Sequence, residues 1–118
     1  MKPYTLPTVE QKIEIYSITM QMLINDERMC ICSGIIAAQD QNHMKLYDWS
    51  KGEETTFKTN SSYVDDLNNM SINFPEIDKH RPKFKSHDEF WWGTDNAGMK
   101  IRIDILKEEI DALKATLK

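Results

Sequence analysis

Cysteine is scarce in this chain of 118 residues, which contains only Cys30 and Cys32. A disulfide bond across one intervening residue is geometrically unfavourable, so we expect two reduced, buried thiols. A zinc site would also need His80 and His87, but zinc sites usually place two to four residues between cysteines and three to five between histidines. The spacings here are one and six. The sequence therefore predicts no metal site and no cofactor.

Long apolar runs and glycine-rich loops are also missing. There is no apolar run of about 18 residues, so we expect no transmembrane helix and no action at a membrane. No apolar core of a secretion signal follows Met1, and we expect a cytoplasmic protein. The chain has neither a glycine-rich phosphate loop nor the Gly-x-Ser-x-Gly turn of serine hydrolases. We therefore expect no enzyme.

The charges are mixed and mildly acidic, with 19 acidic against 15 basic residues and a formal net charge of −4. Because both signs are interspersed, we expect no binding to duplex nucleic acid, which requires a dominant basic face. One segment departs from this pattern. Residues 79–87 carry four formal positive charges and no acid, and they shortly precede the aromatic run Phe90-Trp91-Trp92.

Two amphipathic segments predict long helices near the two ends of the chain. The first helix opens at Thr8, with Gln11 completing a capping box, and ends near Asn25. Its apolar residues form two strips, so we expect burial on two sides. Thr94 or Asp95 caps the last helix. The two helices are expected to pack together, the last one through Met99, Ile103, Leu106, Ile110, Leu113 and Leu117.

The middle of the chain predicts shorter elements. The apolar run 29–38 favours a central helix capped by Asp26, with Gly34 allowing a close neighbour. A short β-hairpin is compatible with residues 44–60, and a short helix is expected from Ser62. Phe74-Pro75 begins another helical turn, which Pro82 ends. The sequence thus predicts one mainly α domain over residues 1–118, a compact small helical domain with room for a hairpin.

The basic and aromatic residues around the last helix form the candidate binding site. Neighbouring tryptophans face different directions, so one is expected in the core and the other half-exposed. The N-terminus of the last helix favours anions, and an arginine lies just beyond its first turn. Such a site suits a nucleotide, a phosphorylated metabolite or an acidic protein surface. Alternatively, both tryptophans belong to the core and the charges are solvated. The candidate residues are Trp91, Trp92, Arg102, His80, Arg81 and Lys83.

The order of short motifs resembles small uncharacterised proteins of bacteriophages and prophages. The motifs are a buried cysteine segment, Phe74-Pro75-Glu76-Ile77, Arg81-Pro82, Phe90-Trp91-Trp92, Gly98 and the Arg102 to Lys107 segment. The resemblance implies an accessory protein that inhibits host machinery, for example a defence component, without catalysis. It would bind a host protein or sequester a small anionic, nucleotide-like ligand, and it could form a homo-oligomer. The alternatives are a small metal-dependent or thiol enzyme and a purely structural, oligomerising assembly factor.

Overall fold

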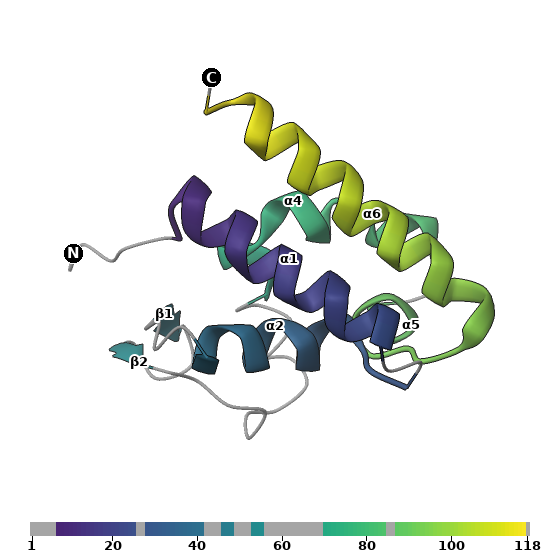
Figure 1. Ribbon diagram of the computed structural model, residues 1–118. Helices are drawn as coiled ribbons and strands as arrows, with labels where there is room; N and C mark the ends of the chain where they lie inside the picture. Colours follow the sequence, from purple (N-terminus) through teal and green to yellow (C-terminus); the bar gives the residue numbers. More distant parts are fainter. Residues whose placement is uncertain are drawn as a thin grey trace.

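The computed structural model describes residues 7–25, 28–41, 46–48, 53–55, 70–84 and 87–117. Most of them are helical, and a short antiparallel pair of strands follows the second helix (Figure 1). The fold is therefore mainly α with a short hairpin, as predicted. The elements in chain order are α1 (Val9–Asn25), α2 (Ile31–Gln41), β1 (Leu46–Asp48), β2 (Glu53–Thr55), α4 (Pro75–Asp78), η1 (Arg81–Lys83), α5 (His87–Trp91) and α6 (Asn96–Ala115).

Helix α1 begins at the predicted capping box. The backbone amide of Gln11 donates to Thr8 Oγ1 at 3.2 Å, and the Thr8 amide donates to Gln11 Oε1 at 2.9 Å. These reciprocal bonds satisfy two amides that the first helical turn leaves without a partner. The helix ends at Asn25, so both predicted ends of α1 are confirmed.

Helix α1 packs against both α2 and α6, which confirms the predicted burial on two sides (Figure 1). The contact with α2 is close at Gly34. A Cβ atom added there would lie 2.8 Å from Thr19 Cγ2, closer than side chains normally approach. Thr19 is fully buried and donates its hydroxyl to the Ile15 carbonyl at 2.8 Å. Glycine at position 34 thus lets α1 and α2 pack closely without displacing the side chain of Thr19.

Helix α2 confirms the predicted helical state of the apolar run, but the predicted cap is wrong. The helix begins at Ile31, too far along the chain for Asp26 to cap it. Cys30 takes the capping position, since its sulfur accepts the Ser33 amide at 3.4 Å and its carbonyl accepts the Gly34 amide at 3.0 Å. Cys30 and Cys32 are both buried, and neither forms a disulfide bond.

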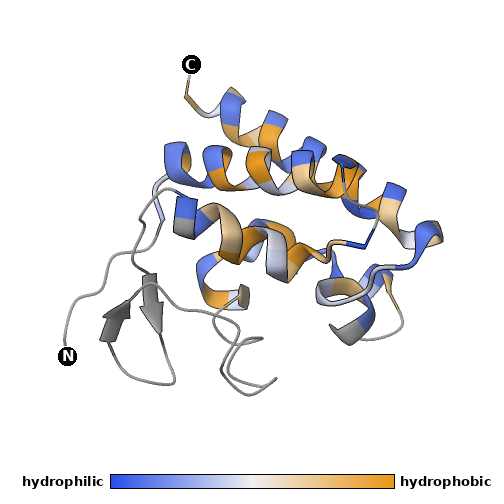
Figure 2. Ribbon diagram, turned by 60° about the horizontal axis from the view of Figure 1, so that its bottom comes forward, coloured by the Kyte–Doolittle hydropathy of each residue, from blue (hydrophilic) through white to orange (hydrophobic). Residues whose placement is uncertain are grey.

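Helix α6 begins at Asn96 and is capped by Asp95, whose Oδ2 accepts the Gly98 amide at 2.7 Å; Thr94 is not the cap. The predicted apolar stripe largely faces the core, whereas Leu117 lies beyond the helix end and is 50% exposed. In Figure 2, orange stretches lie mostly between the helices and blue on their outer turns. The buried core residues from α6 are Met99, Ile105, Leu106 and Ile110.

The segment before α5 differs from the sequence prediction in one respect. Pro75 occupies the first position of α4, as predicted, but α4 already ends at Asp78. Pro82 does not end this helix; it lies inside the separate turn η1. Most of the helix expected from Ser62 lies outside the described residues. Residues 70–73, at the end of that segment, are helical. None of the described helices has the length and apolar character needed to span a bilayer.

Candidate functional site

Arg102 lies at the centre of the junction between α5 and α6. The sequence predicted a side chain directed at a ligand, but Arg102 is fully buried. Its Nε donates to the Phe90 carbonyl at 3.3 Å, and Nη2 donates to the Glu89 carbonyl and, at 3.0 Å, to Asp95 Oδ1. The guanidinium carbon lies 4.9 Å from the centre of the Phe84 ring. We call residues 79–84 the basic turn. The arginine therefore joins α5 and the end of the basic turn to α6.

Asp95 connects this arginine to the helix cap. One carboxylate oxygen accepts from Arg102 and the other accepts the Gly98 amide. The hydrogen bond from Arg102, followed by that from Gly98, lowers the pKa of the Asp95 carboxyl below its usual 3.8. The N-terminus of α6 thus already faces a negative charge from its own chain, which disfavours an external anion there.

Two glycines leave the space that the guanidinium group occupies. A Cβ atom at Gly98 would lie 2.7 Å from Arg102 Nη1 and 2.8 Å from Asp95 Oδ2. A Cβ atom at Gly93 would collide with the Glu89 carbonyl and with Arg102 Nη2. Gly98 therefore requires a residue without a side chain so long as the arginine lies where it does, whereas Gly93 is also restricted by the backbone carbonyl of Glu89.

The two tryptophans face different environments, as neighbouring residues are expected to do. Trp91 is fully buried, and its indole nitrogen donates to Asp78 Oδ1 at 2.8 Å. Its ring meets that of Phe90 edge-on, with centroids 5.3 Å apart. Trp92 is half-buried and packs against the core. Arg81 also approaches Asp78, with 3.6 Å between Nε and Oδ2, so this carboxylate brings two of the candidate residues together.

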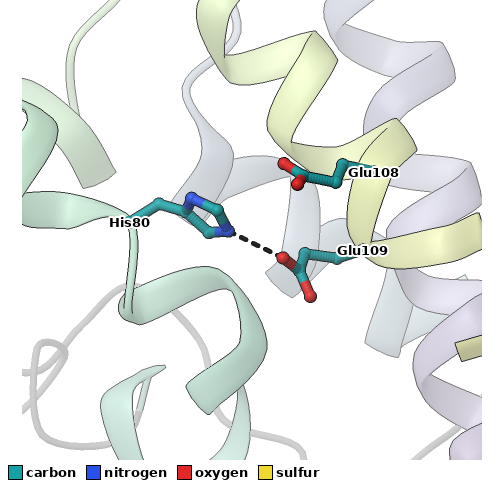
Figure 3. A group of neighbouring side chains, drawn as sticks. All are labelled: His80, Glu108 and Glu109. Carbon is teal, nitrogen blue, oxygen red and sulfur yellow. Dashed lines mark hydrogen bonds and ion pairs between the residues drawn. The ribbon is translucent and has the colours of Figure 1, made fainter. Parts of the chain in front are cut away.

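His80 belongs to a second polar group, which joins the basic turn to the middle of α6 (Figure 3). His80 Nε2 lies 2.7 Å from Glu109 Oε2, and its Nδ1 lies 2.8 Å from Lys83 Nζ. Lys79 Nζ reaches the same Glu109 oxygen at 3.2 Å. His80 is 7% exposed and Glu109 is 5% exposed. A buried imidazole therefore bridges a buried carboxylate and a lysine amine.

The hydrogen-bond network assigns the tautomer of His80. A carboxylate only accepts hydrogen bonds and an ammonium group only donates them. A neutral imidazole with its proton on Nε2 satisfies both, since Nε2 donates to Glu109 while Nδ1 accepts from Lys83. Both ring nitrogens are therefore in use.

Ligand atoms of His80, Glu108 and Glu109 lie within 4.8 Å of one another, which is close enough for one metal ion to contact all three. A metal on Nε2 would leave the proton on Nδ1, and that proton would need an acceptor. Lys83 offers an ammonium donor there instead, and Lys79 already neutralises Glu109. The residues present suit an acid–base pair better than a cation.

A shallow depression of about 250 Å³ lies between the basic turn and the first turns of α6, and we call it the groove. Lys83 is the one residue of the candidate set that lines it. The other walls combine an aromatic ring, a half-exposed isoleucine, two carboxylates and the bare backbone of a glycine. Residues lining the groove include Lys83, Phe84, Glu89, Asp95, Gly98 and Ile101.

Comparison with protein-family models, with curated proteins and with solved structures finds no match for this chain. The candidate site therefore stands on its geometry alone.

Sequence reasoning did not assign a functional role to Glu109, Phe84, Glu89 or Ile101. The sequence does contain a signal for Glu109. Arg102, Leu106 and Glu109 are separated by four and then three residues, so they lie on the same, buried face of α6. Charged residues at apolar positions of an amphipathic helix indicate buried partners. The partners themselves come from residues 79–90, which no local pattern links to this helix face.

Proposed function

We propose that this chain is a non-enzymatic accessory binding protein of the bacteriophage type, which inhibits a host protein by occupying part of its surface. The observation that carries the proposal is the groove, at the junction where the sequence placed a binding site. It presents Lys83, the Phe84 ring and Ile101, whose side chain is 47% exposed. Aromatic and aliphatic groups beside charges are typical of protein contact surfaces.

Of the two ligand classes that the sequence suggested, the geometry favours a protein over a nucleotide-like anion. Arg102 is already bonded to acceptors of the chain, and Asp95 occupies the end of α6. Glu89 also lines the groove, so carboxylates outnumber the single lysine among the residues named above. An anionic ligand would meet repulsion there, whereas a protein surface can supply complementary groups.

Native mass spectrometry of the protein, expressed in bacterial cells and purified under mild conditions, tests this function. We expect a complex with a host protein at a fixed stoichiometry. A stoichiometric nucleotide in its place would support the sequestering mechanism and contradict contact inhibition. A homo-oligomer without any other partner would support a structural assembly factor instead.

A further inference from the structure

We propose that Lys83 is a nucleophilic amine, activated by His80 and Glu109, which captures small carbonyl compounds as an imine. The three side chains are joined in series, with 2.7 Å from Glu109 Oε2 to His80 Nε2 and 2.8 Å from His80 Nδ1 to Lys83 Nζ. Such a series, in which a base contacts the nucleophile and a third group orients the base, activates serine and cysteine nucleophiles in proteins, and here the nucleophile is a lysine amine. This proposal is independent of the identity of any protein partner.

The positions of the atoms fit the amine form of Lys83 as well as the ammonium form. When the proton moves from Nζ to Nδ1, the imidazolium donates back to the amine across the same 2.8 Å contact. The Glu109 carboxylate, on the opposite side of the ring, then stabilises the imidazolium. The transfer therefore forms a buried ion pair between His80 and Glu109 and releases the lone pair of Lys83.

Exposure to solvent increases along the series from Glu109 through His80 to Lys83. The carboxylate and the imidazole are buried, whereas Lys83 is exposed and lines the groove. The apolar surfaces of Phe84 and Ile101 would hold an organic group near the amine. The carboxylates of Glu89 and Asp95 disfavour an anionic compound. The geometry thus points to small neutral or cationic aldehydes and ketones.

The covalent step needs no further reactant. The Lys83 ammonium transfers a proton to His80 Nδ1, and the amine attacks the carbonyl carbon while the C=O π bond opens. The oxygen takes a proton from the attacking nitrogen, which gives a carbinolamine. The imidazolium then protonates the hydroxyl group, water leaves, and the C=N bond forms. The net change is an aldehyde and an ammonium group giving a protonated imine and water.

Lys79 provides the matched control within the same turn. Its amine lies 3.2 Å from Glu109 Oε2 and its side chain is 59% exposed. Lys79 contacts the carboxylate directly and Lys83 contacts the imidazole, so the comparison isolates the effect of His80 as a general base. Lys100 and Lys107, on the exposed face of α6, serve as solvated controls.

The test is reductive alkylation of the native protein with acetaldehyde and sodium cyanoborohydride at pH 7, followed by peptide mapping in a mass spectrometer. We expect Lys83 to be alkylated faster than Lys79, Lys100 and Lys107, on the order of tenfold or more. In urea, where the fold is lost, the four lysines should react alike. Equal rates at Lys83 and at the solvated lysines of the native protein would overturn the proposal.

The variants Glu109→Gln and His80→Gln then test the activating series. Both should reduce the rate at Lys83 to that of Lys100, while the rate at Lys100 itself stays unchanged. Persistence of the excess rate in both folded variants would overturn the role of His80. If either variant fails to fold, as circular dichroism would show, the comparison of Lys83 with Lys79 in the native chain still decides the proposal.

Discussion

Gly98 lies directly against the guanidinium group of Arg102, with only 2.7 Å between Nη1 and the position that a Cβ atom would take. Alanine favours a helix over glycine by about 1 kcal/mol, so propensity alone predicts that Gly98→Ala stabilises α6. The structure predicts the opposite sign. We expect a loss of about 1–3 kcal/mol in the free energy of unfolding, measured by urea denaturation, because the arginine must move.

The double variant Gly98→Ala with Arg102→Met isolates this contact. Once the guanidinium is removed, the added methyl group should cost less than it does in the native background. If the cost of Gly98→Ala is the same in both backgrounds, Arg102 is not what excludes a side chain at this position.

Replacement of Arg102 by methionine should destabilise the protein by at least about 2 kcal/mol, because each carbonyl left without a donor costs roughly 1–3 kcal/mol. The affected carbonyls are those of Glu89 and Phe90. Arg81→Met is the control, since its 3.6 Å contact with Asp78 is partly exposed and is worth less than about 1 kcal/mol. Similar losses for the two variants, measured by chemical denaturation, would contradict the central place of Arg102.

The tryptophans should differ in the same assay. Trp91→Phe removes the indole bond to Asp78 and part of a fully buried ring, so we expect a loss of about 2 kcal/mol or more. Trp92→Phe, at a half-buried position, should cost about 1 kcal/mol or less. Equal losses would mean that both rings are anchored alike, which their difference in burial does not predict.

The charge of the Asp95 carboxyl should make the free energy of unfolding depend on pH. Its pKa is lowered in the folded protein, first by the hydrogen bond from Arg102, so the charged form stabilises the fold. That contribution is complete above the usual pKa of 3.8 and is lost as the pH falls through the lowered value. Asp95 is 49% exposed, so solvent reduces the size of the effect.

Unfolding of the native chain and of Asp95→Asn from pH 7 to pH 2 measures this contribution. The native chain should be the more stable at neutral pH, and the difference should disappear at the acidic end. Asp104→Asn, at an exposed position of the same helix, controls for the general effect of removing an acid. A difference between the native chain and Asp95→Asn that grows as the pH falls would contradict the assigned role.

The elements predicted correctly are those whose signals are local. Thr8 and Gln11 are three residues apart, and their capping box marks the start of α1 in the sequence and in the structure. The cap of α2 shows the limit of this reasoning. Aspartate is a far commoner capping residue than cysteine, which favoured Asp26 in the sequence. Cys30 nevertheless takes the position, because the helix begins at Ile31.

The candidate site was only partly predictable, because its contacts join distant segments. The composition of residues 79–92 directed attention to the junction with the last helix. It could not show that Arg102 turns inward to Phe90, or that His80 meets Glu109, 29 residues further along the chain. Such pairings depend on how the turn packs on α6, so they follow from the fold rather than from spacing.

The groove as a contact surface is the central claim, and two matched isoleucines test it most directly. Ile101 lines the groove and is 47% exposed; Ile24, on α1, is 51% exposed and is not among the groove residues. Host proteins captured by the native chain, by Ile101→Asp and by Ile24→Asp would be compared quantitatively by mass spectrometry. We predict a partner that Ile24→Asp retains and Ile101→Asp loses. Retention by both folded variants, or loss by both, would contradict the claim.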